Sequence, residues 1–450
     1  MAKLSDTAMK QTIAAQDPRS GVGLLVIALA GTVLFHGGLL PFTHGNTYDA
    51  FIHMFFGDSY ARSWFDHWDE RWYTGFLTIS YPPGTHMAIG TLSKVMPLRA
   101  AYVLVQLAAL LLLTIGVYRF ALLWVPPRAA GYAAIFLTLS SAISETVHFF
   151  GQLPTTFSLA IFLNGLPYNY RWIAAGRWTD FGAAVVFGAA TTASHHVTTI
   201  FGAVLFILPI GLHALTATAE LHPIEPGQVT SRKQRRVWLR SALMRFQPPI
   251  WRGLLLAVCL LAAIVFTILP HWIWSISDPI TQVPIPHGSR ANFLERTDLG
   301  FIFFVLPWGM AIIFLPYAAI KTATTRLWPL GGSLFFCFLL GTGGTTPIPR
   351  AILGGAFDIL TLDRFTFWGT ILILPFIGLV FDGLINGRSG KLITQAFGRT
   401  SRGVITSGLF IGFVVSAVVP AALPLVRPTQ PDFIDPAPIV EFMQSDNHDR

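Results

Sequence analysis

Acidic, imidazole and guanidinium side chains gather in a few short segments of this chain, and Tyr48–His86 is the richest of them. If residues 48–64 form a helix, Asp49 and His53 lie one turn apart on one face. A carboxylate placed there can remove a proton from an acceptor hydroxyl, or bind a metal together with His53. The alternative is that Asp49 caps the helix by accepting backbone N–H bonds. His86 follows a rigid Tyr-Pro-Pro turn, which shapes the wall of the site, and can reach the same site.

Arg364, in the segment Thr361–Phe365, is the second strong candidate. A guanidinium makes forked hydrogen bonds to phosphate and keeps its charge at any working pH. Arg350 ends a Gly- and Pro-rich loop shortly before it and could share the same phosphate. The alternatives for Arg364 are an ion pair with Asp363, or simple extension of the side chain toward water.

Two further groups of side chains complete the candidate site. His195 and His196 are adjacent at the end of an apolar stretch, so at most one faces a site unless the helix breaks there. Either one is a candidate substrate or metal contact, and the alternative is a buried histidine satisfied by its neighbours. Metal binding is left open, with a divalent cation as the cofactor to consider and Asp49, His53 and Glu145 as candidate ligands.

Several common catalytic motifs are missing from the sequence. It contains no GxxxxGK[ST], HExxH, GxSxG or CxxC pattern, which argues against an ATP-driven pump, a zinc protease of that type and an α/β-hydrolase. Its two cysteines both lie within apolar stretches and are expected to be core residues. The basic segment SRKQRRVWLR fits a loop that faces anionic lipid, and no nucleic-acid partner is expected.

The elements that must position these residues are membrane-spanning helices. The chain is 53% hydrophobic and only 12% charged, with a mean hydropathy of +0.58. Apolar runs of about 17–25 residues recur, long enough to cross a bilayer. We predict an all-α polytopic bundle of about eleven spans. They start near residues 21, 101, 129, 155, 181, 198, 253, 300, 328, 367 and 404, and residues 181–215 could be one long helix or two.

The distribution of Lys and Arg orients the bundle. Most basic residues fall in loops on the side of the N-terminus, which predicts a cytoplasmic N-terminus and an extracytoplasmic C-terminus. The expected divisions are a cytoplasmic tail (1–20), the transmembrane domain (21–424) and an extracytoplasmic segment (425–450) that looks like the start of a further domain. Within the transmembrane domain, 42–97 is the first outer loop and 217–252 a basic cytoplasmic loop. All the candidate site residues then meet at the outer face.

The chain resembles the polytopic membrane glycosyltransferases of the GT-C fold. Four features carry the resemblance: YDAFIH after the first span, the pattern W…W…G…YPP, a histidine at an outer helix tip, and a late LDRF. The chain is most similar to the bacterial "6-pyruvoyl-tetrahydropterin synthase-related" membrane proteins. The resemblance implies a polyprenyl-phosphate sugar donor, a base or metal ligand at Asp49 and a phosphate contact at Arg364. One departure is that Asp49 has no acidic neighbour, where several such families carry two adjacent acids.

The sequence therefore predicts a glycosyltransferase that works at the outer face of a bacterial cytoplasmic membrane. Its partners would be the lipid-phosphate sugar donor, a glycan or glycolipid acceptor of the cell envelope, and the bilayer. Two alternatives remain: a transporter or flippase for a lipid-linked sugar, and a non-catalytic scaffold of envelope assembly. A transporter would hold charges near the middle of the membrane, whereas here they gather at one interface.

Overall fold

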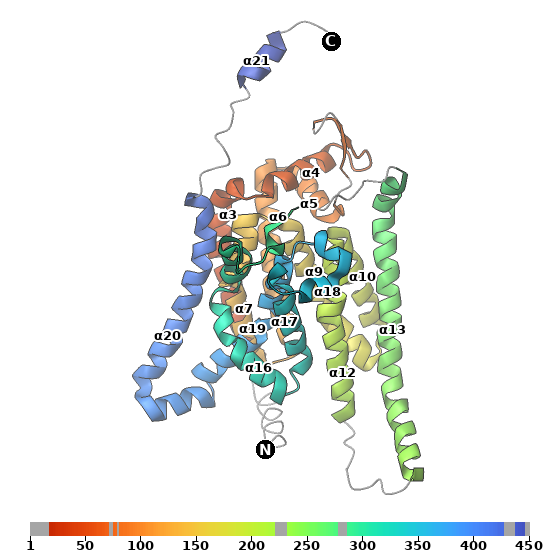
Figure 1. Ribbon diagram of the computed structural model, residues 1–450, viewed down its shortest axis with the longest axis vertical. Helices are drawn as coiled ribbons and strands as arrows, with labels where there is room; N and C mark the ends of the chain where they lie inside the picture. Colours follow the sequence, from red (N-terminus) through yellow and green to blue (C-terminus); the bar gives the residue numbers. More distant parts are fainter. Residues whose placement is uncertain are drawn as a thin grey trace.

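The computed structural model describes residues 18–71, 75–78, 81–220, 232–277, 286–426 and 437–445. This part of the chain is almost entirely helical, as the apolar periodicity predicts. Figure 1 shows most helices running along the long axis of the molecule, while α4 lies across the end nearest the C-terminus. The strands that it contains form a short antiparallel hairpin in the first outer loop, with Trp68 opposite Leu77.

The first half of the chain builds one side of the bundle and its predicted outer end. Its helices and strands are α2 (Pro18–Thr32), η1 (Val33–Gly37), α3 (Gly38–Thr43), η2 (His44–Asn46), α4 (Ala50–Arg62), β1 (Trp68–Asp69), β2 (Phe76–Leu77), α5 (Gly84–Ser93), α6 (Leu98–Ala121), α7 (Pro127–Thr138), α8 (Ser141–Ser144), η3 (Glu145–Phe150), α9 (Leu153–Ala175), α10 (Trp178–Ser194), α11 (His196–Gly202), η4 (Ala203–Ile207) and α12 (Leu208–Glu220). The π-helical turns η1, η3 and η4 interrupt spans that are otherwise α-helical.

The second half supplies the remaining spans and their connections. Its elements are α13 (Arg232–Ser277), η5 (Gly288–Arg290), α14 (Thr297–Gly300), η6 (Phe301–Val305), α15 (Leu306–Trp308), η7 (Gly309–Phe314), α16 (Leu315–Thr324), α17 (Trp328–Leu340), η8 (Gly343–Thr345), α18 (Ile348–Leu353), η9 (Gly354–Asp358), α19 (Asp363–Ile385), α20 (Arg388–Val426) and α21 (Ala437–Ser445). Much of the predicted basic loop 217–252 is thus the first part of the 46-residue helix α13.

Eight helical stretches in the described chain are long and apolar enough to cross a membrane, so the chain is a membrane protein. They are Arg19–Asn46, Leu98–Ala121, Pro127–Phe150, His196–Ala217, Phe246–Pro270, Thr297–Thr324, Asp363–Ile385 and Arg388–Val426. The other three predicted spans correspond to α9, α10 and the shorter α17. The number eleven and the orientation of the termini stay predictions, and residues 1–17 of the predicted tail lie outside the described residues.

Close helix packing depends on small residues at the crossing points. In α19, a Cβ at Gly378 would collide with the backbone carbonyl of Ala129 in α7. Small residues let the backbones of membrane helices approach closely, because lipid provides no hydrophobic drive for their association. The contact places α19 in the centre of the bundle, where Trp368 and Phe376 are fully buried. Its first residues therefore lie in the middle of the predicted outer end.

Candidate functional site

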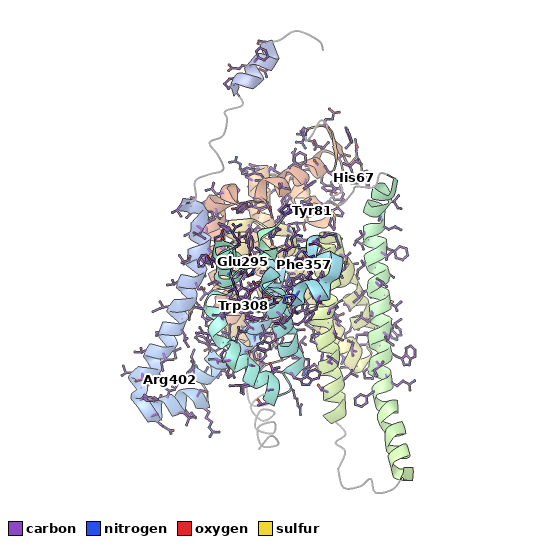
Figure 2. All side chains as sticks on the ribbon, viewed as in Figure 1. His67, Tyr81, Glu295, Trp308, Phe357 and Arg402 are labelled. Carbon is purple, nitrogen blue, oxygen red and sulfur yellow. The ribbon has the colours of Figure 1, made fainter. Side chains whose placement is uncertain are left out.

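The candidate site lies at the end of the bundle that is predicted to be outer, where segments distant in sequence meet. They are the start of α4, the start of α5, the π-helical turn η3, the break between α10 and α11, and the start of α19. Helix α5 packs against both α4 and α10, and η3 packs against α20 and α9. Tyr81, which precedes α5, lies at this end of the bundle (Figure 2). The first outer loop thus covers the ends of the inner helices.

Asp49 stands at the N-cap position of α4, but its side chain makes no capping hydrogen bond. The Thr47 hydroxyl accepts the Ala50 N–H instead, at 3.1 Å. The Asp49 carboxylate is half-buried, and burial together with the nearby charge of Asp363 raises its pKa from 3.8 to about 6. The capping alternative is therefore not observed. A carboxylate with a pKa near 6 is suited to general-base chemistry near neutral pH.

The backbone at Asp49 is fixed by the chain that leaves η3. The Asp49 N–H donates to the Phe150 carbonyl at 2.9 Å. Directly after it, Gly151 has φ +76°, and a Cβ there would collide with Thr47. Glycine is thus required for η3 and the first outer loop to come this close. Single π-helical turns are frequently found at functional sites.

Glu145 begins this π-helical turn and is buried, with a carboxylate oxygen, Oε1, that has no hydrogen-bond partner in the described structure. Its charge interacts with that of Asp363. One turn further along, His148 is directed into the bundle, where its Nε2 lies 3.0 Å from His36 Nδ1 and its Nδ1 lies 2.8 Å from the Thr43 hydroxyl. Glu145 is therefore near Asp363 at the start of α19, while His148 contacts His36 and Thr43 in the helix interior.

His53 and His86 form a hydrogen-bonded pair, with 3.1 Å between His53 Nδ1 and His86 Nε2. Both rings are buried, which holds the pKa of His53 well below 6.5 and lowers that of His86 to about 3. The other nitrogen of His86, Nδ1, faces the Pro82 carbonyl without reaching regular hydrogen-bond geometry. A carbonyl favours a proton on Nδ1, so we infer that His86 accepts through Nε2 and His53 donates through Nδ1. This leaves His53 Nε2 as an acceptor with no partner among the described residues.

Tyr81 is the residue that sequence reasoning undervalued. Its ring packs edge-on against His53 and His86, with centroids 5.7 Å and 5.5 Å apart. Burial and the charge of Asp49 raise its pKa, while the charge of Arg364 lowers it. The phenol is therefore close to both principal candidates. The two prolines that follow Tyr81 in the sequence predicted a rigid turn. They did not predict that its side chain would point toward the two histidines.

Arg364 and Asp363, the first residues of α19, point to different partners. Arg364 donates through Nε to the Thr361 carbonyl at 2.8 Å and through a terminal nitrogen to the Thr361 hydroxyl at 2.9 Å. The Asp363 carboxylate accepts from Gln152 at 3.3 Å. Both residues lie in the described part of the chain, and no direct ion pair joins them. The guanidinium is thus anchored on one side by Thr361, with its charge unpaired by a carboxylate.

The tandem histidines lie at a real break in the helix. His195 has an extended backbone (φ −166°, ψ 102°) between α10 and α11, which settles residues 181–215 as two helices. Its Nδ1 is 3.1 Å from the Thr198 hydroxyl, and burial followed by the charge of Arg364 lowers its pKa. The two rings are 6.0 Å apart and inclined by only 33°. The break therefore lets both rings approach Arg364, which a continuous helix would prevent.

Arg350, a predicted phosphate contact, has a protein partner. Arg350, in α18, is exposed, pairs with Asp358 at 2.9 Å and covers the Phe357 ring at 4.6 Å. Its role in holding phosphate stays a prediction. Asp58 and Arg62 form the exposed i,i+4 ion pair that their spacing indicates, at 3.0 Å.

The described residues do not assemble a metal site. Within the ranges given above, no three His, Cys, Asp or Glu side chains converge in a way that could hold an ion. Of the three candidate ligands, His53 uses Nδ1 to bond His86, and Glu145 is buried in η3. The arrangement of these described residues does not fit a bound cation.

Comparison with known proteins identifies the fold. No family model and no curated protein matches the chain. The oligosaccharyltransferase of Archaeoglobus fulgidus in its apo form is similar with a TM-score of 0.54 at 15% identity, over 95% of this chain and 58% of that one. The oligosaccharyltransferase AglB of the same organism, in complex with an inhibitory peptide and a dolichol-phosphate, gives 0.50 at 14% identity over the same shares.

This chain has the GT-C fold. Oligosaccharyltransferases are glycosyltransferases of that fold, and the likeness extends over nearly the whole chain. The chain spans 58% of the length of these neighbours. At 14–15% identity the similarity establishes the architecture alone.

Proposed function

We propose that the chain is a glycosyltransferase that moves a sugar from a polyprenyl-phosphate donor to a cell-envelope acceptor at the outer face of a bacterial membrane. The observation that carries the proposal is Arg364, whose guanidinium has no carboxylate partner in the described chain. Its charge and that of the raised-pKa carboxylate of Asp49 both act on the Tyr81 phenol. A phosphate at the membrane surface is the anion that such a guanidinium would bind. The dolichol-phosphate in the complex of AglB supports the same class of donor.

The transfer needs one base and one stabilised leaving group. Asp49 would take the proton of the acceptor hydroxyl while the oxygen of that hydroxyl bonds to the anomeric carbon of the sugar. The bond from that carbon to the phosphate oxygen breaks, and its electron pair stays with the lipid phosphate. Arg364 would neutralise this charge, with the Thr361 bonds holding the guanidinium in place beforehand. Inversion at the anomeric carbon follows from a single displacement and is part of the proposal.

The histidines would position the reactants. His53 Nε2 can accept from a hydroxyl because the His86 contact holds its other nitrogen as a donor. His195 is near both this pair and Arg364, and His196 is near Arg364. All four would therefore bind substrate, with Arg350 a further candidate. The same proposal includes three further points: a bacterial origin, an outward orientation of the site, and a special likeness to the "6-pyruvoyl-tetrahydropterin synthase-related" proteins.

An apolar groove beside the site gives the lipid tail a place to lie. It has a volume of about 530 Å³ between the span of α11, η4 and α12 and the facing side of α13. Its lining includes Thr199 and Ile200, one turn below the tandem histidines, and continues to Leu261 and Ile264. Phe201 in the same turn packs edge-on against Phe365, 5.3 Å away. The groove therefore reaches the helical turn whose Phe201 contacts the start of α19.

Arg364→Lys and Arg364→Ala test the proposal through binding of polyprenyl phosphate without sugar, measured by native mass spectrometry of the purified full chain. Lysine keeps the charge and loses the planar fork. Loss of a charge-assisted bond should weaken binding by about ten- to a hundredfold, and alanine should be worse. Arg296→Lys is the matched control, because Arg296 is exposed and paired with Asp298. Equal binding by both Arg364 variants and the wild type would refute the assignment.

A further inference from the structure

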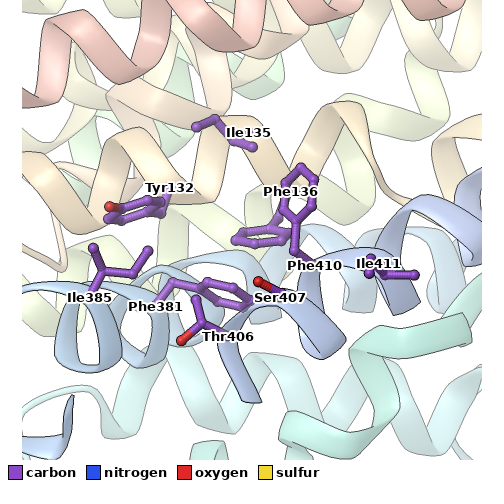
Figure 3. A pocket seen from close by; sticks show the side chains of 9 residues that line it. All are labelled: Tyr132, Ile135, Phe136, Phe381, Ile385, Thr406, Ser407, Phe410 and Ile411. Carbon is purple, nitrogen blue, oxygen red and sulfur yellow. The ribbon is translucent and has the colours of Figure 1, made fainter. Parts of the chain in front are cut away.

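A second cavity lies at the opposite end of the bundle from the candidate site. It has a volume of about 450 Å³, and Figure 3 shows its side chains converging from three helices. Helix α7 contributes Tyr132, Ile135 and Phe136, α19 contributes Phe381 and Ile385, and α20 contributes Thr406, Ser407, Phe410 and Ile411. Ile385 is the last residue of α19, whose first residues belong to the site. The cavity is therefore separate from the candidate site.

The interior of this cavity suits a hydrocarbon chain. Six of its nine lining side chains are aliphatic or purely aromatic hydrocarbon. The Thr406 hydroxyl is already satisfied, since it donates to the Arg402 carbonyl at 2.9 Å. The volume lies within the range of small-ligand pockets, about 300–1,000 Å³. It is too small for a partner helix, which is about 10–12 Å across with its side chains.

Basic residues lie in the chain segments that border the cavity. Helix α20 bends at Gly398 (φ +86°), and Figure 1 shows this bend at the lower left of the bundle. Just after it, Arg402 donates to the carbonyl of Ile385, a residue of the cavity lining. Arg399 is exposed one turn earlier, as is Lys391 before the bend.

The neighbouring segments add two more basic residues and one acid. Arg128 lies one turn before Tyr132 in α7, and Arg388 begins α20. One acid, Asp382, lies one turn before the Asn386 side chain, from which it accepts a bond at 3.1 Å. Five basic residues and one carboxylate thus lie in the segments that border this apolar cavity. This combination selects a ligand with a hydrocarbon chain and an anionic head.

We propose that the cavity is a binding site for an anionic phospholipid of the adjacent leaflet. One acyl chain occupies the space between α7, α19 and α20, and the headgroup lies against Arg402 and Arg399. A zwitterionic lipid carries its own ammonium beside the phosphate and gains less from these cations, whereas basic pockets between membrane helices favour anionic headgroups. The bound lipid would brace the bend of α20 against α7 and α19.

The test compares phosphatidylglycerol with phosphatidylcholine of the same acyl chains, added to the purified full chain in detergent. Retained lipid is counted by native mass spectrometry, and the apparent unfolding temperature is measured in parallel. We expect phosphatidylglycerol to be retained and to raise the unfolding temperature, and excess polyprenyl phosphate not to displace it. Arg399→Gln and Lys391→Gln should each weaken retention by about fivefold. Both residues are exposed, so these variants keep the fold.

Ser407→Trp fills the cavity and should abolish retention, with Val415→Trp as the control on the same helix, since Val415 is 55% exposed. If Ser407→Trp does not fold, the two charge variants decide the question alone. Equal retention of both lipids by the wild type would show a non-selective lipid contact and overturn the proposal. So would unchanged retention of phosphatidylglycerol by the charge variants.

Discussion

Replacing Asp49 with asparagine should destroy transfer and, at the same time, make the protein more stable at neutral pH. The change is nearly isosteric and removes the charge and the basicity. Removal of a general base typically costs about a hundredfold to ten-thousandfold in rate. In the native protein, a pKa of about 6 leaves about nine tenths of the carboxylates ionised at pH 7, so wild-type activity should fall as the pH drops through about 6.

The stability change follows from the same raised pKa. Asp49 binds its proton more tightly in the folded chain than in the unfolded one, where the pKa is 3.8. The folded state is therefore penalised progressively as the pH rises from about 4 to about 6, and fully above that. A difference of about two pKa units corresponds to about 3 kcal/mol, which is an upper limit for a half-buried group. The Asp49→Asn variant escapes this penalty above pH 6 and gains nothing below pH 4.

The assay has two independent readouts. Transfer of labelled sugar from a polyprenyl-phosphate donor is measured in membrane vesicles, and the apparent unfolding temperature of the purified protein is measured at pH 7.5 and pH 4. Asp58→Asn is the control, because Asp58 is on the same helix but pairs with Arg62 and Arg71 at the surface. It should retain activity within a few-fold of the wild type.

Each readout can refute a different part of the reasoning. Transfer by Asp49→Asn within a few-fold of the wild type would remove Asp49 as the base. An unfolding temperature that falls at pH 7.5, or that rises equally at both pH values, would mean that the buried charge carries no penalty. Loss of activity together with added stability is the outcome that a purely structural role for Asp49 would not produce.

Two further predictions concern topology and packing. The topology test uses a chain without its two native cysteines. A cysteine in place of Phe65 (89% exposed) should react with a membrane-impermeant reagent added outside, and one in place of Phe397 (73% exposed) should not. The reverse result would invert the proposed orientation. Gly378→Leu should destabilise the bundle by about 1–3 kcal/mol through overpacking against Ala129, and its unfolding temperature should fall. Gly182→Leu is the control and should have little effect, because the space around Gly182 is open. Equal effects of the two glycine substitutions would argue against the close contact of α19 with α7.

The sequence by itself determined the class of the protein and much of its local structure. Long apolar stretches specify membrane helices because a backbone in lipid must satisfy its own hydrogen bonds. The four-residue spacing of Asp49 and His53 placed them one turn apart near the start of a helix, and α4 begins at Ala50. The tandem histidines after Ser194 marked the break between α10 and α11. Each of these inferences depends on residues that are close in the chain.

Partner choice was decided only by the tertiary structure. Nothing in the spacing showed that His53 would bond His86, 33 residues away, or that Asp363 would contact Gln152 and leave Arg364 to Thr361. Arg350 looked free to bind phosphate, yet it pairs with Asp358. The sequence does not predict these partners because hydropathy and periodicity indicate only whether a residue faces lipid, water or protein. Which charge meets which depends on how helices distant in sequence pack together, and that is where the unpaired guanidinium and the raised pKa arise.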